Sequence, residues 1–463
     1  MRSAKISQKH DLPTYMIVAW GLGTLPIALM FNTFNALALR YFTDYLGLAA
    51  ATAGSLIALS KIYDAVTDPA MGWISDRTNT RFGKRRPYLL IGALICSLSI
   101  AVIFSLAKLP FGGSAIAVFL ALILFATGYT VYNVPYIAMP AEMSFTSKTR
   151  SSLMSWRVFV IGGGSLVAGA LAPMIVHWAG GGAEGHSAMG LSVAAMIAAS
   201  GFFTFFLLRG APEIQFKRSV QTMSWRENVR TIFSNRPFAI LMAVKLFLLS
   251  AVAISASTLA FFTVWILDKD YSVLGMILFF MTGGQLIATP LWLWVYRRIG
   301  AKRTFLISAA FFAIISMTWL LADSSEALWI TYGRSLLKGL GAGGVLLVGQ
   351  TLLPDVIEYD RLTTALRREG VLSGIYTTVE KVAFALATAL LGVWLQVMHY
   401  VPQLDPVSDS QPASTITALH YCQSFFPSAL IGIAAIFVLF YSLDEKRLIE
   451  LRGEQAASSA LGQ

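Results

Sequence analysis

The chain has 463 residues, of which 56% are hydrophobic and only 13% charged, and its formal net charge is +11. Ordinary soluble domains carry about 25% charged residues, so this composition excludes a soluble globular protein. A helix needs roughly 20 mostly apolar residues to cross a bilayer. We therefore predict an all-α polytopic membrane protein with twelve spans, near 14–39, 47–75, 87–107, 113–141, 155–178, 188–208, 237–267, 271–296, 304–322, 328–355, 371–398 and 417–443.

The basic residues predict how these spans are oriented. Cytoplasmic loops of membrane proteins carry an excess of Lys and Arg. If the N-terminus is cytoplasmic, the outer segments hold only Arg40, Lys108 and Lys269, and all other basic loop residues lie inside. We therefore expect a multi-pass protein of the plasma (inner) membrane with both termini cytoplasmic. The net charge follows from this asymmetry and does not indicate nucleic-acid binding.

A polar stretch at 209–236 divides the twelve spans into two sets of six. The basic loops "DRTNTRFGKRR" and "YRRIGAKR" each follow the second span of a set. Their matching positions favour two six-helix bundles related by repeat, as in the major facilitator architecture, although the positive-inside rule could explain each loop alone. The expected parts are an N-terminal bundle (1–208), a cytoplasmic linker (209–236), a C-terminal bundle (237–443) and a cytoplasmic tail (444–463), in a monomer.

The sequence does not favour an enzyme. It contains no constellation of a Ser or Cys nucleophile with its partners and no phosphate-binding loop. Cys96 and Cys422 lie in predicted spans, where small buried side chains are their expected role. We expect no catalytic residues and no cofactor.

The second span carries three ionisable side chains in "KIYDAVTDPA", namely Lys61, Asp64 and Asp68. At 100° per residue they fall within an arc of about 60° on one helix face. Charges inside a membrane usually face a partner or a watery cavity. This cluster sums to −1, so we predict that it binds Na⁺, Li⁺ or H⁺. A closed ion triad without a ligand is the alternative.

Other charged residues also lie within predicted spans, and their roles are open from sequence alone. Lys245, Arg334 and Lys338 are expected either to reach the membrane interface or to pair at a gate. Glu380 precedes Lys381 directly, which suggests an ion pair for that lysine.

Three segments resemble the glycoside–pentoside–hexuronide:cation symporter family, whose best-known members are melibiose permeases. They are "YFTDYLGL…KIYDAVTDPAMGWISDRTNTRFGKRRPYLLIG", "GYTVYNVPYIAMPAEM" and "LLPDVIEYDRLTTALRREGVLSGIYTTVEKVAFALA". The resemblance covers most of the chain. It implies a secondary active transporter that moves a sugar, a glycoside or a related small polar solute by Na⁺- or H⁺-coupled symport.

The resemblance also implies roles for individual residues. Asp64 and Asp68 match the carboxylates that coordinate the coupling cation (the only expected metal site, if the cation is Na⁺), and Thr130 and Thr377 match hydroxyls that frame that site. Residues that match the lining or support of the sugar cavity are Tyr129, Arg157 and Lys381. Asn133, four residues after Tyr129 on the same helix face, is also expected to bind the solute.

Two positions depart from the pattern of the melibiose type. That type carries sugar-binding carboxylates on its first and fourth helices, whereas this chain has Ala28 and Asn133 there. An amide can still bind a hydroxyl group, but it brings no charge. We therefore expect weak or absent binding of simple galactosides.

The loop "GWISDRTNTRFGKRR" resembles the gating motif of major facilitators. The resemblance implies that Asp76, Arg77 and Arg85 latch the cytoplasmic helix ends.

Three alternatives to a sugar symporter remain open from the sequence. A cation-dependent lipid or lysolipid transporter, or another non-sugar transporter of the same superfamily, also fits the paired aspartates. A proton-driven drug exporter would share the fold without this cluster. A non-transporting receptor would be expected to lose the acidic pair.

Overall fold

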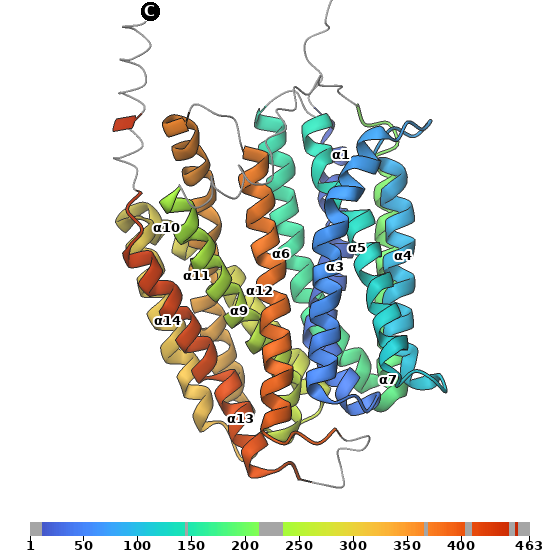
Figure 1. Ribbon diagram of the computed structural model, residues 1–463, viewed down its shortest axis with the longest axis vertical. Helices are drawn as coiled ribbons and strands as arrows, with labels where there is room; N and C mark the ends of the chain where they lie inside the picture. Colours follow the sequence, from blue (N-terminus) through green and yellow to red (C-terminus); the bar gives the residue numbers. More distant parts are fainter. Residues whose placement is uncertain are drawn as a thin grey trace, which may run out of the picture.

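A computed structural model describes residues 12–143, 147–212, 235–364, 369–402, 410–443 and 450–451. All regular structure in these ranges is helical, and the helices lie side by side along the long axis of the molecule (Figure 1). The first half contains α1 (Thr14–Leu22), α2 (Leu25–Arg40), α3 (Ala50–Arg77), α4 (Arg86–Ser105), α5 (Ala115–Met143), α6 (Ser147–Trp178) and α7 (Gly182–Leu207). The second half contains α9 (Arg236–Trp265), α10 (Tyr271–Met317), α11 (Leu328–Thr364), α12 (Glu369–Val397), α13 (Ala413–Gln423) and α14 (Phe425–Leu439).

The described residues contain the twelve predicted crossings. Ten segments are long and apolar enough to span a membrane. One of them, Tyr271–Leu321, is 51 residues long, and α10 within it is interrupted at Gly300, whose φ of 81° is a conformation that favours glycine. The 28-residue helix α3 is not among the ten, because its charged side chains lower its mean hydropathy. Adding α3 and dividing the long segment at Gly300 gives twelve, so the predicted polytopic fold is confirmed.

Two spans that were predicted as continuous are each built from two helices. The first is broken between α1 and α2, where Pro26 lies in the first turn of α2. The last is broken at Ser424, between α13 and α14, and Pro427 lies in the first turn of α14. Proline has no N–H to donate to a preceding turn, so it tends to begin a new helix rather than continue an old one.

The helices form two bundles. Helices α1–α7 pack mainly against one another, as do α9–α14, and the bundles meet chiefly where α3 contacts α12 and α6 contacts α10. Figure 1 shows α3 and α12 side by side at the centre of the molecule. Residues 213–234, most of the predicted linker, lie outside the described residues, so the limits of the four parts stay a prediction.

The bundles touch backbone to backbone at one end of the molecule. We call the end where α1 begins and α14 ends the terminal end (the top of Figure 1) and the opposite end, where α3 begins, the far end. A Cβ atom added to Gly392 of α12 would lie 2.4 Å from the carbonyl oxygen of Ala50 in α3. Glycines allow such close helix crossings in membranes. The structure is therefore tightly closed near the far end.

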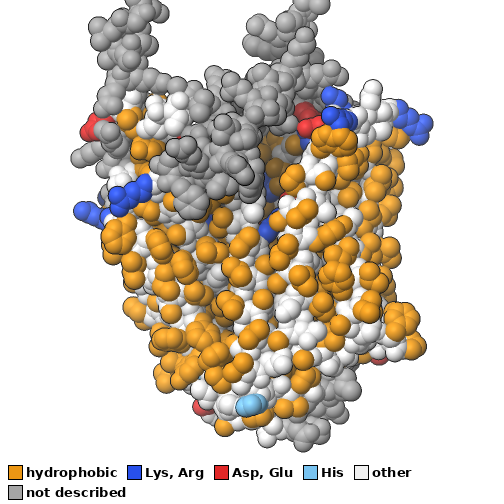
Figure 2. All heavy atoms as spheres, viewed as in Figure 1, with side chains coloured by type: hydrophobic (Ala, Val, Ile, Leu, Met, Phe, Trp, Pro, Cys, Tyr) orange, Lys and Arg blue, Asp and Glu red, His pale blue; other side chains and the backbone are white. Residues whose placement is uncertain are grey.

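The outer surface is suited to lipid. Large apolar side chains such as Phe159, Trp294 and Leu390 are exposed, and Figure 2 shows hydrophobic side chains over the middle of the molecule. Cys96 and Cys422 are free and buried, which confirms their prediction as small buried side chains.

Candidate functional site

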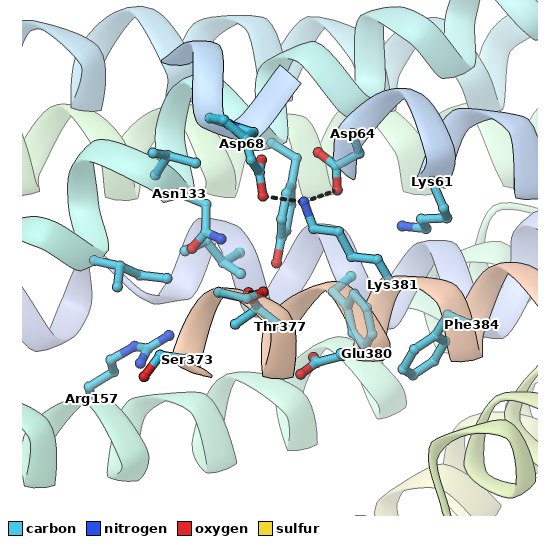
Figure 3. Close-up of a pocket in the computed structure, with 17 residues that line it drawn as sticks. Lys61, Asp64, Asp68, Asn133, Arg157, Ser373, Thr377, Glu380, Lys381 and Phe384 are labelled. Atoms are coloured by element: carbon cyan, nitrogen blue, oxygen red, sulfur yellow. Dashed lines mark hydrogen bonds and ion pairs between the residues drawn. The ribbon is translucent and has the colours of Figure 1, made fainter. Parts of the chain in front are cut away.

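A cavity of about 490 Å³ lies between the two bundles. Helices α2, α3, α5 and α6 line one side and α12 lines the other (Figure 3). The lining residues of α5, α6 and α12 lie in the parts of these helices nearer the terminal end. In Figure 2, Lys and Arg side chains are visible between the apolar faces below that end. The polar lining residues are Lys61, Asp64, Asp68, Tyr129, Asn133, Arg157, Ser373, Thr377, Glu380 and Lys381.

The ammonium group of Lys381 lies between the two carboxylates of α3. Its Nζ atom is 2.8 Å from Asp64 Oδ2 and also donates to Asp68 Oδ2 (Figure 3). Asp64 is buried, and the Lys381 side chain is 14% exposed. One lysine therefore bridges both carboxylates and joins the two bundles at this point.

Thr130 of α5 completes this cluster. Its hydroxyl oxygen lies 2.5 Å from Asp64 Oδ1 and 2.9 Å from Asp68 Oδ1. A hydroxyl has a single hydrogen, so it fully satisfies only one carboxylate oxygen at a time. Three helices, α3, α5 and α12, therefore meet at the carboxylates, which face other helices and not lipid.

Lys61 forms no ion pair with the two aspartates, which pair with Lys381 instead, so the alternative of a closed triad of these three residues is wrong. The Lys61 Nζ atom lies over three phenylalanine rings, 5.5 Å from the centroid of Phe125, 5.6 Å from that of Phe34 and 5.9 Å from that of Phe31. In Figure 3 it lies apart from the dashed contacts. Aromatic faces attract a cation. This pocket of rings holds the ammonium group near the carboxylates without contact.

Thr377 lines the same cavity but does not reach the carboxylates. Its hydroxyl donates to the backbone carbonyl of Gly374, at 2.8 Å, within α12. Such a bond to the preceding turn is common for threonine in helices. The structure thus brings together Asp64, Asp68 and Thr130 of the predicted cation-site residues, and leaves Thr377 to one side.

All four residues expected to line the solute cavity do so: Tyr129, Asn133, Arg157 and Lys381. Two of their polar atoms, Asn133 Oδ1 and Arg157 Nε, are buried without a hydrogen-bond partner among the described residues. Buried polar atoms are normally paired in folded proteins. Unpaired polar atoms in a cavity wall are available to a ligand. Lys381, the fourth residue expected to contact solute, is instead engaged by the carboxylates.

Glu380 pairs with Lys245 and not with its neighbour Lys381, so the predicted ion pair is wrong. Lys245 Nζ lies 3.0 Å from Glu380 Oε2 and donates to the carbonyl oxygen of Tyr376 at 2.8 Å. Successive residues point in directions about 100° apart on a helix. Glu380 therefore faces α9, while its side chain remains 47% exposed in the cavity.

The other basic residues within the second bundle also have internal partners. Arg334 forms an ion pair of 2.9 Å with Glu326. Lys338 is buried and donates to Ser255 Oγ at 2.9 Å and to the carbonyl oxygen of Gln423 at 3.0 Å. Both side chains therefore pair within the second bundle, Arg334 with a residue of the loop that precedes α11.

A latch of charged residues lies at the terminal end of the first bundle. The guanidinium group of Arg85 lies 2.5 Å from Asp76 Oδ1 and 2.7 Å from Glu142 Oε1. Arg77, expected in the same latch, instead lies with its guanidinium carbon 3.9 Å from the ring centroid of Trp73. Glu142 of α5 is the second carboxylate partner of Arg85.

A buried ion pair at the far end was missed by the sequence analysis. Arg40 Nε lies 2.9 Å from Asp44 Oδ2, and the two side chains are 1% and 2% exposed. Arg40 is thus a buried residue at the end of α2 and not a solvated loop residue, and its assignment to the outer side stays a prediction. Asp44 lies in a π-helical turn, Tyr41–Tyr45, a rare geometry that is often found at functional sites.

The second bundle supplies the partners of this pair. Arg40 Nη1 donates to the Tyr271 hydroxyl at 2.7 Å, and the Tyr400 hydroxyl donates to Asp44 Oδ1. Trp265 Nε1 in turn donates to the Tyr400 hydroxyl at 3.3 Å. We call Arg40, Asp44, Tyr271 and Tyr400 the far-end latch. It ties the two bundles together on the side of the cavity away from the terminal end.

Comparison with known proteins supports this description. Residues 19–445 match the model of the family "MFS/sugar transport protein". The chain is 25% identical to the inner membrane symporter YicJ of Escherichia coli (strain K12), over 97% of this chain and 95% of that protein. It is 24% identical to the isoprimeverose transporter of Lactiplantibacillus pentosus, over 99% and 95%, and 26% identical to the glucuronide carrier protein homolog of Escherichia coli (strain K12), over 94% of both.

The fold is likewise shared with solved transporters. The structure of a D-xylose-proton symporter superposes with a TM-score of 0.67 at 15% identity, covering 93% of this chain and 98% of that one. The resemblance to cation symporters stated from the motifs is confirmed by these relatives.

Proposed function

Because the chain belongs to the MFS/sugar transport protein family, we propose that it moves a sugar, glycoside or related small polar solute together with a monovalent cation by alternating access. The comparisons do not favour the alternative of a lipid or lysolipid transporter, since the similar proteins are symporters and sugar carriers by name. The observation that carries the proposal is the position of Lys381 between Asp64 and Asp68.

The coupling cation binds where the Lys381 ammonium group now lies. One carboxylate oxygen from each aspartate contacts that position, and the Thr130 hydroxyl holds the other oxygen of each carboxylate in place. Oxygen ligands suit hard cations such as Na⁺ or Li⁺, and a proton could instead bind to a carboxylate. Since two positive charges in one low-dielectric site repel each other strongly, the cation and the Lys381 ammonium group exclude one another.

This exclusion provides the coupling. When the cation binds, Lys381 is released from the carboxylates and can donate hydrogen bonds to a solute in the cavity that it already lines. A bound solute in turn keeps Lys381 away from the carboxylates, so that each ligand raises the affinity for the other. Such reciprocity is required of any coupled binding equilibrium.

Contacts between the bundles at the far end control access to the cavity from that side. The far-end latch and the contact of Gly392 with Ala50 close one side. We assign the terminal end to the cytoplasm, because the basic loops with Arg77, Arg81 and Lys84 lie there. The structure then represents an inward-facing monomer in the inner membrane, with both termini cytoplasmic. Arg85 and Asp76 would hold the cytoplasmic helix ends, and Arg77 would not.

The proposal involves transport only, with no catalytic step and no prosthetic group. It is tested by measuring uptake of labelled glycosides and uronides into vesicles that contain the purified protein. We expect a Na⁺, Li⁺ or H⁺ gradient to drive accumulation above the external concentration. Uptake of a solute that is equally fast and equally complete without any cation gradient would contradict symport.

A further inference from the structure

The charges around the cavity do not cancel. Three basic residues line it, Lys61, Arg157 and Lys381, and so do three carboxylates, those of Asp64, Asp68 and Glu380. Glu380 is already neutralised by Lys245, a fourth basic residue that lies just behind the lining. One positive charge of the protein's own groups is therefore left over around the cavity.

Arg157 carries this excess charge. Lys381 pairs with both aspartates, and Lys61 lies over its three phenylalanine rings close to the same cluster. Across the part of the chain that the structure describes, no carboxylate lies within ion-pair distance of the Arg157 guanidinium group, and its Nε atom is buried and unpaired. Figure 3 shows Arg157 at the opposite side of the cavity from Lys61, next to Ser373.

Binding of the coupling cation makes the imbalance larger. The cation adds a second positive charge to a cavity whose own groups already sum to one. Charges held within the membrane are costly unless they are compensated nearby, and desolvation strengthens the repulsion between like charges. A neutral solute would leave both charges uncompensated, whereas an anionic solute would remove one of them.

The uncharged residues Ala28 and Asn133 of the first bundle also favour an anionic solute. The melibiose-type pattern would place carboxylates at the positions of Ala28 and Asn133. Negative side chains there would repel an anionic solute. Asn133 lines the cavity without a charge, and its buried Oδ1 atom is free to accept a hydrogen bond.

We propose that the transported solute is a polyhydroxylated molecule with one anionic group, a carboxylate or a sulfonate, and that Arg157 binds this group. This inference rests on the proposed function and specifies its substrate class. A guanidinium group binds two oxygens of such a group through paired N–H donors. The hydroxyl groups would then be bound by Asn133, by Lys381 after the cation has released it, and by the exposed carboxylate of Glu380.

Matched pairs of solutes test the proposal, because the members of each pair differ mainly in charge. Methyl glucuronide is compared with methyl glucoside, methyl galacturonide with methyl galactoside, and 6-deoxy-6-sulfoglucose with glucose. Calorimetry on the purified full-length protein, at saturating cation, gives the affinities. We expect the acidic member of at least one pair to bind ten-fold or more tightly than its neutral partner. A preference for the acidic member in the uronide pairs would indicate that the anionic group is a carboxylate, and a preference in the sulfoglucose pair would indicate a sulfonate.

Variants assign the effect to Arg157. Arg157→Gln should bring the preference for the acidic member to less than two-fold, and Arg157→Lys should retain part of it. Arg298→Gln removes a charge from an exposed site far from the cavity and should leave the preference unchanged. Cation binding and the melting temperature of Arg157→Gln show whether the cavity remains folded.

The proposal is overturned if no acidic member binds, if the members of each pair bind equally, or if neutral members bind more tightly. Cation-driven accumulation of a neutral sugar would overturn the anionic class while leaving symport intact. Binding of acidic solutes without any dependence on cation would instead contradict the proposed symport and leave the anion preference standing.

Discussion

Lys381 of α12 and Asp64 of α3 form an ion pair of 2.8 Å that connects the two bundles through the centre of the membrane protein. The same ammonium group contacts Asp68, so one side chain from the second bundle neutralises part of a carboxylate pair in the first. An ion pair across the moving interface is a suitable point for a ligand to act on, because breaking it changes how the bundles interact.

Replacing either aspartate should separate coupling from transport. Asp64→Asn and Asp68→Asn preserve the shape of the side chain but remove a charge from the site. We expect the variants to insert into the membrane and to exchange solute, yet to lose accumulation driven by the cation gradient. For an electrogenic step this drive is about 2.3 kcal/mol per charge per 100 mV. Concentrative uptake and downhill exchange are measured in the same vesicles.

Accumulation by both variants at the level of the unaltered protein would show that these carboxylates serve structure alone. Loss of exchange together with accumulation would be equally informative. It would place Asp64 and Asp68 in solute binding rather than in coupling.

Removing Lys381 should strengthen binding of the coupling cation. Lys381→Met leaves the two carboxylates without their bridging ammonium group, so we expect at least ten-fold tighter binding of the coupling cation in the absence of solute. Solute accumulation should be lost, because the side chain that responds to the cation is absent. Calorimetric titration with Na⁺ and Li⁺, and the proton uptake of the purified protein, measure the cation affinity.

Lys61→Met is the matched comparison, since it removes a second lysine near the same carboxylates. It leaves Lys381 in place, so coupling should persist while the cation affinity shifts. Unchanged or weaker cation binding by Lys381→Met would contradict the competition between the lysine and the cation.

Much of the site can be predicted from one helix. The spacing of Asp64 and Asp68 places both carboxylates on one face of α3, and the cost of charge in a membrane implies a partner. That reasoning also selected Lys61, because a helical wheel shows directions and not contacts. The side chain is long enough to turn toward Phe31, Phe34 and Phe125, which lie on other helices and cannot be placed from the sequence of α3.

Contacts between distant segments were harder to predict. Thr130 and Lys381 were selected only through the family resemblance, and the resemblance did not show that Lys381 would occupy the carboxylates. Arg40 and Asp44 are four residues apart near a predicted span end, where charged residues are usually solvated. Their burial depends on Tyr271 and Tyr400, more than 200 residues further along the chain. Only the docked bundles place these four side chains together.

The close crossing of α3 and α12 predicts a sensitive position at the far end. A Cβ atom on Gly392 would lie 2.4 Å from the Ala50 carbonyl oxygen, so Gly392→Ala should prevent the bundles from closing there. We expect binding of external solute to persist while uptake falls at least ten-fold. Gly432→Ala is the matched control, because no atom lies within 4 Å of its added Cβ. Normal uptake by Gly392→Ala would show that the crossing can relax.

The far-end latch should set the balance between the inward- and outward-facing states. Tyr400→Phe removes a hydroxyl that donates to Asp44 across the bundles. A hydrogen bond to a charged group contributes about 1.5–3 kcal/mol, and this one exists only while the far end is closed. The variant should therefore shift the equilibrium more than ten-fold toward the outward-facing state.

Spin labels measure this shift directly. Ser114→Cys and Ser324→Cys place labels in exposed far-end loops of the two bundles, and their separation should increase in the Tyr400→Phe variant. Cys96 and Cys422 are buried and are replaced beforehand to prevent stray labelling. Tyr421→Phe removes an exposed tyrosine hydroxyl of α13 and should leave the distance distribution unchanged. If Tyr400→Phe also leaves it unchanged, the Tyr400 hydroxyl does not contribute to closure, which then depends on the hydrogen bond from Arg40 to Tyr271 and on the glycine crossing.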